Sequence, residues 1–293
     1  MGIREAVAAA ITEATGLPFQ ITAQSHVGGG DINESFRLDG GDGRRFFLKL
    51  NDARHVAMFV AEAAGLAVIA ATNTLRVPQP VAHGAEENRC YLVLEYLDLG
   101  GSGSGKLLGE QLAALHRCTS DRFGFAQDNF IGVTPQQNTW TDDWITFWRE
   151  RRLGFQLDLA AREGYKGTLQ ELGRELMQRL PEFFEGYAPQ PSLLHGDLWG
   201  GNHGFLKDSA PVIFDPAAYY GDREADLAMT ELFGGYGADF YAAYRASWPL
   251  HAGYARRKIL YNLYHILNHA NHFHGGYARQ AEGMMRSLLG SSS

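Results

Sequence analysis

The spacing of hydrophobic residues along this chain changes near residue 100. Before that point, short segments alternate apolar and polar positions with a period of two, which predicts β-strands separated by turns. The expected strands are residues 19–27, 34–38, 45–50, 80–85 and 90–96, with helices at 4–15 and 54–71. This part of the chain is therefore expected to form a small, strand-rich lobe with one main helix.

After the glycine-rich segment 98–105, apolar positions recur with a helical period. The expected helices are 106–118, 141–163, 168–185, 223–233, 237–247, 252–272 and 276–289, interrupted by short strand-like pieces at 192–195, 203–206 and 211–215. Strands followed by helices indicate an α+β fold and not an alternating, doubly wound sheet. We expect a bilobal protein, with a β-rich N-lobe at 1–97, a hinge or linker at 98–105 and a larger helical C-lobe at 106–293.

The predicted C-lobe contains the polar residues that are most informative about function. Asp197 follows His-Gly, Asn202 comes five residues later, and Asp215 comes eighteen residues after Asp197. This spacing is typical of a kinase-like fold, in which one carboxylate orients the attacking hydroxyl and two further side chains bind Mg²⁺. Asp197 is therefore the candidate general base, and Asn202 and Asp215 are candidate metal ligands. The alternative is that the two aspartates are turn and cap residues.

Gly28, Gly29 and Gly30 form a turn between the first two expected strands. A dinucleotide-binding turn would open a helix, whereas a strand follows here. We expect the backbone N–H groups of this turn to approach the phosphates of ATP. Lys49, the cation of an otherwise apolar strand, is the expected phosphate ligand, and Glu62 on the next helix can pair with it. A plain hairpin turn, a surface lysine and a solvated glutamate remain the alternatives.

Asp226 lies just inside an expected apolar helix, and only ten residues separate it from Asp215. A buried aspartate there is expected to accept backbone hydrogen bonds from the loop that contains Asp197, which is a structural role. The short interval leaves no room for the activation segment of a protein kinase. Kinases of small molecules with the same architecture remain.

Composition changes this interpretation little. The 293 residues are 45% hydrophobic and 20% charged, as in an ordinary globular protein. A net charge of -7 argues against a nucleic-acid-binding surface. No uninterrupted apolar run reaches the roughly 18 residues of a membrane span, so we expect no membrane association and a cytoplasmic location.

Aromatic and histidine residues give weaker signals. Trp199, inside the polar segment, is a candidate contact for the acceptor substrate, whereas Trp144 is more simply a core residue. His265, His269 and His272 share one face of an expected helix. A zinc site would need a further ligand at matching spacing, so ordinary hydrogen-bonded histidines are expected.

These motifs together resemble the fructosamine kinase (ketosamine-3-kinase) family. The resemblance extends over about residues 20–288 and is carried by the segments 28–33, 112–117, 128–132, 194–199, 226–235 and 268–277. The tryptophan directly after His-Gly-Asp-Leu is specific within the wider kinase-like clan. The resemblance implies ATP-dependent phosphorylation of the 3-hydroxyl of a ketosamine, which is a sugar adduct formed by glycation of an amine. The phosphorylated adduct breaks down and frees the amine.

The resemblance also implies residue roles. It gives Asp197 and Lys49 the roles stated above and makes Glu95, Tyr96 and Leu97 the hinge that binds adenine through backbone atoms. One departure is the Gly-Gly pair at 200–201, which stands where Ser-Gly is commoner. ATP, Mg²⁺ and a free or protein-bound ketosamine are the expected ligands, while the sugar and the oligomeric state are left open. The alternatives are an aminoglycoside- or choline-kinase-type phosphotransferase and, less favoured, a pseudokinase that only binds nucleotide.

Overall fold

The computed structural model describes residues 2–28 and 32–290, and the chain divides into two compact units. Unit 1 comprises residues 1–104 together with 202–217, and unit 2 comprises residues 105–201 and 218–293. The sequence prediction placed residues 202–217 in the C-lobe. They belong with unit 1 because they carry their own hairpin, whose strand residue Val212 bridges to Arg76.

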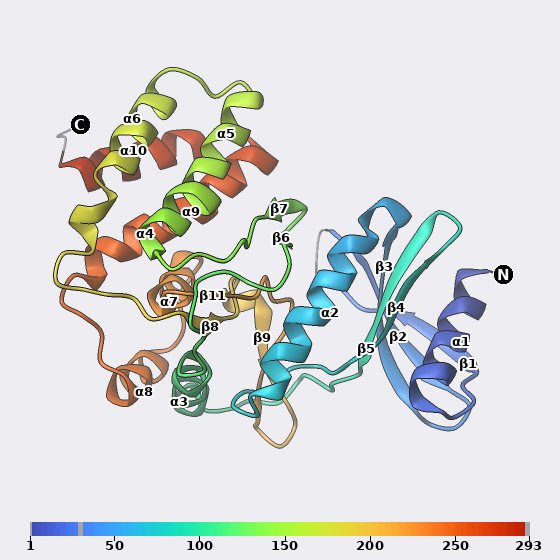
Figure 1. The fold of residues 1–293 in the computed structure, drawn as a ribbon. Coiled ribbons are helices and arrows are strands. Elements are labelled where there is room, and N and C mark those ends of the chain that lie inside the picture. The colour runs from blue at the N-terminus through green and yellow to red at the C-terminus, as the bar shows by residue number, and fades with distance from the viewer. Residues whose placement is uncertain (1, 29–31, 291–293) are drawn as a thin grey trace. The chain divides into compact units, whose positions relative to one another are not determined.

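Unit 1 is built on a five-stranded antiparallel sheet with strand order β1-β2-β3-β5-β4 (Figure 1). The strands are β1 (Ile21–His26), β2 (Glu34–Gly40), β3 (Arg45–Asp52), β4 (Pro80–Glu86) and β5 (Arg89–Glu95). The helices α1 (Ile3–Thr15) and α2 (Val56–Ala71) pack against β4 and β5. All these elements lie within two residues of the bounds that the hydrophobic period predicts.

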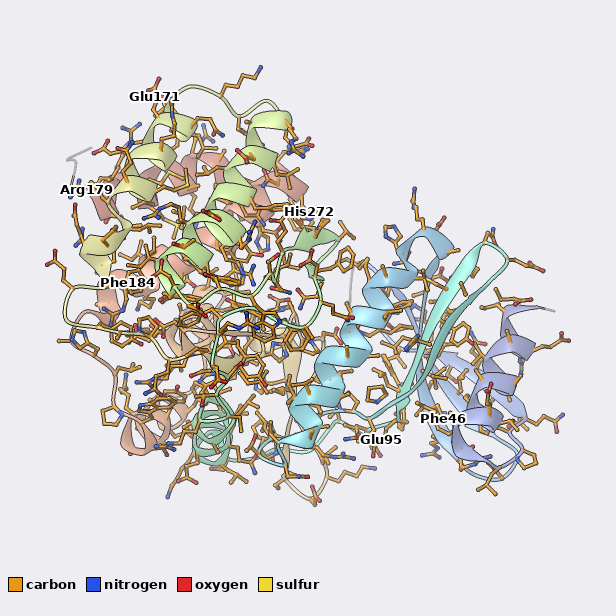
Figure 2. All side chains as sticks on the ribbon, viewed as in Figure 1. Phe46, Glu95, Glu171, Arg179, Phe184 and His272 are labelled. Carbon is orange, nitrogen blue, oxygen red and sulfur yellow. The ribbon has the colours of Figure 1, made fainter. Side chains whose placement is uncertain are left out.

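Strand β3 presents different chemistry on its two faces. Phe46, Leu48 and Leu50 join residues of α1 in one hydrophobic core. Because successive side chains of a strand point to opposite faces, Lys49 projects from the other face. The register pairs Phe46 with Glu95 of β5, and both side chains are labelled in Figure 2. The alternation of β3 thus places one cation on the face opposite the α1 core.

One helix is long and apolar enough to cross a membrane when a few charged residues are tolerated: residues Ala53–Ala71, which include α2. A single such helix is weak evidence for a membrane span, because a core helix of a globular protein has the same composition. Here α2 packs against β4 and β5, and its Glu62 forms an ion pair with Lys49. These contacts are those of a helix that belongs to the lobe.

Unit 2 is mainly helical (Figure 1). Its α-helices are α3 (Gly105–His116), α4 (Trp144–Phe147), α5 (Phe155–Arg162), α6 (Thr168–Gln178), α7 (Arg223–Leu232), α8 (Ala238–Ser247), α9 (Tyr254–Phe273) and α10 (Tyr277–Leu289). Two short antiparallel pairs accompany them: β6 (Asn129–Ile131) with β7 (Thr134–Gln136), and β8 (Ser192–Leu194) with β11 (Tyr219–Gly221). The sequence pattern predicts β8 but not β6, β7 or β11.

Two expected helices are interrupted. The segment predicted as one helix over 141–163 contains a π-helical turn, η2 (Trp148–Gly154), between α4 and α5. The segment predicted over 168–185 leaves the α-helix after Gln178 and continues as the short 3₁₀ turn η3 (Leu180–Phe183). Pro181 explains the second break, since proline removes a helical hydrogen bond.

Candidate active site

Lys49 is the centre of a charged cluster in unit 1. Its ammonium lies 2.6 Å from Glu62 Oε1 and 2.6 Å from Asp215 Oδ1. The Lys49 side chain is only 5% exposed. Burial alone would lower the pKa of Lys49, but the two carboxylates raise it above its ordinary value. The ammonium is therefore charged and fixed, and the pairing with Glu62 that the sequence suggests is present.

Asp215 adopts a backbone conformation that is unusual for a residue other than glycine, with φ of 60°. Aspartate tolerates this left-handed region better than most residues, and functional sites often hold such conformations. Its side chain remains about half exposed. Asp215 lies two residues after the buried strand β10 (Pro211–Ile213), so its accessible carboxylate stands at the end of that strand.

The β9–β10 hairpin brings Asn202 and Asp215 to the same end of unit 1. Strand β9 (His203–Phe205) pairs His203 with Ile213, and the Phe214 amide donates to the Asn202 carbonyl at 3.0 Å. Both candidate metal ligands thus flank one ladder although twelve residues separate them in the chain. Carboxylate and amide oxygens are ligands that Mg²⁺ accepts in proteins.

Asp226 of α7 anchors the loop that contains Asp197. Its carboxylate accepts hydrogen bonds from the His195 amide at 2.7 Å and from the Gly196 amide at 2.8 Å. Gly196 has φ of 84°, a conformation that favours glycine. The structural role that the sequence predicts for Asp226 is confirmed. Asp197 itself follows this pinned pair and is partly exposed.

His116 of α3 completes the anchor, a role that no motif or periodicity in the chain indicates. Its Nε2 lies 3.1 Å from Asp226, and its Nδ1 lies 2.8 Å from the Tyr244 hydroxyl. A carboxylate can only accept, so Nε2 donates to Asp226. Burial alone would raise the pKa of Asp226, but the hydrogen bonds from His116 and the Gly196 amide hold it below its ordinary value. The anchor is therefore ionised.

Trp199 lies two residues after Asp197 and is 40% exposed, whereas Trp144 is buried and donates to Tyr261. The Trp199 carbonyl accepts a hydrogen bond from the Tyr236 hydroxyl at 3.1 Å. Its indole lies over Gly201, where a Cβ would come within 2.2 Å of the ring. The Trp199 ring thus packs against the backbone of Gly201, and this packing requires a glycine there.

Gly201→Ala is expected to displace the Trp199 indole, because the added methyl would overlap the ring. If Trp199 contacts the acceptor, the KM for the acceptor rises about tenfold while the KM for ATP stays constant. Steady-state kinetics with each substrate varied in turn measure this. Gly200→Ala is the matched control, since nothing lies within 4 Å of a Cβ at Gly200; equal effects of both changes would contradict the prediction.

The glycine turn at 28–30 and the hinge segment 95–97 are the remaining parts of the predicted nucleotide site. Gly28 is exposed at the end of the first hairpin arm, and Gly29 and Gly30 lie outside the described residues. The Glu95 amide donates to the Gln79 carbonyl at 2.8 Å, and its carboxylate pairs with Arg76. This amide is therefore engaged, and the predicted adenine contacts of the hinge segment 95–97 would use its other backbone groups.

Residues 3–291 match the family described as fructosamine kinase. The chain belongs to this family. It is 48% identical over 288 residues to a protein named probable ketoamine kinase from Synechocystis, covering 97% of this chain and 96% of the relative. It is 45% identical over 278 residues to the chloroplastic protein-ribulosamine 3-kinase of Arabidopsis thaliana, covering 92% of this chain and 83% of the relative.

Solved structures agree with this fructosamine kinase assignment. A proposed fructosamine-3-kinase from Haemophilus somnus has a TM-score of 0.88 and 29% identity, with 97% of this chain and 96% of that chain covered. The choline kinase LicA of Streptococcus pneumoniae has a TM-score of 0.64 at 12% identity, covering 98% and 99%, which shows the fold alone. The predicted protein-kinase-like α+β fold is confirmed.

Two of the histidine rings of α9, those of His269 and His272, have hydrogen-bond partners. His272 Nε2 lies 2.5 Å from the Thr134 hydroxyl, and His269 Nδ1 lies 2.7 Å from the His265 carbonyl. Figure 2 shows His272 beside β7. Within the described parts of the chain, no group of three or more His, Cys, Asp or Glu side chains could hold a metal ion.

His265 is expected to make the protein sensitive to acid. Burial lowers the pKa of His265 to about 3, and His269 adds to the effect. In the unfolded chain the imidazole of His265 is protonated below about pH 6.5, whereas in the folded protein it stays neutral down to about pH 3. The free energy of unfolding is therefore unaffected by this group above pH 6.5 and decreases as the pH falls towards 3. At pH 5 the loss is about 2 kcal/mol. Urea unfolding at pH 7 and pH 5 should show that His265→Gln reduces the difference by this amount, whereas a change of the exposed His83 to Gln should not.

Proposed function

We propose that this protein transfers the γ-phosphoryl group of ATP to the 3-hydroxyl of a ketosamine, which then breaks down and frees its amine. Membership of the fructosamine kinase family supports the proposal, as do relatives named ketoamine kinase and protein-ribulosamine 3-kinase. The observation that carries it furthest is the pinned loop of Asp197, because a fixed carboxylate is what orients an attacking hydroxyl.

Unit 1 supplies the charges for ATP in this proposal. Lys49, held by Glu62, binds the α- and β-phosphates, and the glycine turn at 28–30 covers them through backbone N–H groups. Asp215 and Asn202 would hold Mg²⁺: the half-exposed Asp215 carboxylate and the side-chain oxygen of the buried Asn202 suit a cation that usually keeps one or two protein ligands beside phosphate and water. Bound Mg²⁺ neutralises the charge that develops on the phosphates.

Unit 2 supplies the acceptor chemistry. Asp197 accepts a hydrogen bond from the 3-hydroxyl and takes its proton as the new O–P bond forms. The bond between the γ-phosphorus and the bridging oxygen breaks, and ADP leaves with that electron pair. Trp199, exposed two residues away, contacts the sugar or its amine. Adenine, in contrast, is bound by unit 1, through the segment Glu95, Tyr96 and Leu97.

An ADP-release assay with synthetic lysine adducts of erythrulose, ribulose and fructose tests this function. We expect Mg²⁺-dependent ADP release with at least one adduct, and phosphorus NMR should place the phosphate on O3. Choline and an aminoglycoside serve as comparison acceptors. Turnover of these two without turnover of any ketosamine would instead indicate the aminoglycoside- or choline-kinase class. Nucleotide binding without ADP release on the whole panel would indicate a pseudokinase.

A further inference from the structure

A buried polar cluster in unit 2 has no role in the function proposed above. Its centre is Arg152 in the π-helical turn η2, which is 0% exposed. The guanidinium lies 4.1 Å from the ring centre of Tyr219 and 4.5 Å from that of Phe147. Over residues 2–28 and 32–290, no carboxylate forms an ion pair with it. A buried charge without a carboxylate is costly, so the aromatic faces and hydrogen bonds must compensate for it.

The π-helical turn is what carries Arg152 to this position. Such turns are rare, and they occur mostly as single wide turns at functional sites. Gly154 accommodates the wide turn, because a Cβ at this residue would lie 2.7 Å from the Arg149 carbonyl oxygen. The turn is therefore built into the sequence and is not a frayed end between α4 and α5.

A chain of hydrogen bonds leads from Arg152 to the backbone at residue 218. Arg152 donates to the Gln137 carbonyl at 2.6 Å and to Asn138 Oδ1 at 2.8 Å. The Asn138 side-chain Nδ2 donates to Asn129 Oδ1 at 2.9 Å, and the Asn129 side-chain Nδ2 donates to the Ala218 carbonyl at 2.8 Å. Asn129 belongs to segment 128–132, one of those that carry the family resemblance. We call these contacts the Arg152 chain; its members Arg152, Asn138, Asn129 and Ala218 are buried.

The Arg152 chain ends next to the strand pair that leads into the loop of Asp197. Ala218 precedes Tyr219, which the guanidinium covers and which pairs with Leu194 across β11 and β8. Leu194 is followed by His195, whose amide Asp226 holds. The loop therefore has two supports. Asp226 binds the backbone amides of the loop itself, and the Arg152 chain holds the strand pair that leads into the loop.

We propose that Arg152 is a positioning residue for the phosphoryl transfer, fixing through β11 and β8 the loop that carries Asp197. The inference rests on the proposed function. Arg152 contacts neither nucleotide nor acceptor, because it is fully buried. Its loss should misplace the Asp197 carboxylate without changing the charges of unit 1, and a misplacement of about 1 Å can cost 10²-fold in rate.

Arg152→Met tests this, since methionine keeps the aliphatic stem and removes the charge and the donors. We expect kcat to fall about 10- to 100-fold while the KM for ATP stays within about twofold. Arg152→Lys keeps a cation beside the rings of Tyr219 and Phe147 and should recover most of the lost kcat. Arg149→Met is the matched control on the same turn, because Arg149 donates to the Met177 carbonyl, away from the loop.

Hydrogen exchange gives a readout that does not depend on activity. In Arg152→Met, peptides covering 193–197 and 218–221 should exchange at least tenfold faster, with α9 unchanged. If Arg152→Met fails to fold, Asn129→Ser breaks the bond to Ala218 and should give the same kinetic and exchange pattern. Unchanged kcat and exchange, or equal losses in Arg149→Met, would overturn the inference. An inactive wild-type protein would refute the proposed function, and the exchange result would still decide the positioning.

Discussion

Asp197→Asn is expected to lower the kcat for ketosamine phosphorylation by about 10²–10⁴-fold while leaving the affinity for ATP unchanged. Asparagine fills the same volume but cannot take the proton of the attacking hydroxyl. The loop should keep its shape, because Asp226 holds the amides of His195 and Gly196 and not the Asp197 side chain. Single-turnover kinetics and equilibrium binding of a fluorescent ATP analogue separate the two quantities.

The exposed Asp121 offers a matched control in the same unit. Asp121→Asn removes one carboxylate from the surface and should leave both kcat and nucleotide affinity as they are. Turnover of Asp197→Asn close to that of the wild type would refute the role of Asp197 as proton acceptor.

Asp226→Asn is expected to reduce both stability and turnover. An asparagine oxygen can replace one carboxylate oxygen, but the amide group would face a second N–H donor, leaving a buried donor unsatisfied. Breaking such a buried, charge-assisted set costs about 3–5 kcal/mol. We expect urea unfolding to show this loss and kcat to fall by at least about 10²-fold, because the loop is no longer pinned.

Asp143 provides the comparison for this prediction. Its carboxylate caps α4 by accepting from the Thr146 amide at 2.7 Å, at the surface of the same unit. Asp143→Asn keeps a good capping residue and should cost less than about 1 kcal/mol. If the two variants lost equal stability, the special position of the Asp226 carboxylate would be contradicted.

The parts of the site that could be predicted from sequence are those set by local period. The alternation of β3 fixes which face carries Lys49, and the helical period of α2 places Glu62 within reach of it. Asp226 could be assigned a structural role because it lies inside an apolar helix. In each case a neighbour in the chain, or a single strand or helix, determines the environment.

The remaining parts depend on contacts between segments far apart in the chain. Nothing local shows that His116 binds Asp226, since 110 residues separate them. The sequence around Arg152 predicts an ordinary α-helix, because the apolar positions of the π-helical turn fit both a 3.6-residue period and a wider turn. The pairing of Asp215 with Lys49 was not predicted either, because the two residues are 166 positions apart in the chain.

The path of the chain through its two units has a consequence for how the protein can be divided. The chain passes from one unit to the other at 104/105, at 201/202 and again at 217/218. A fragment ending at residue 104 would keep Lys49 and Glu62 but lose Asp215, leaving a buried cation with one of its two counter-ions. Each unit is made of two separate segments of the chain. Neither unit can therefore be cut out or exchanged between proteins as one continuous fragment.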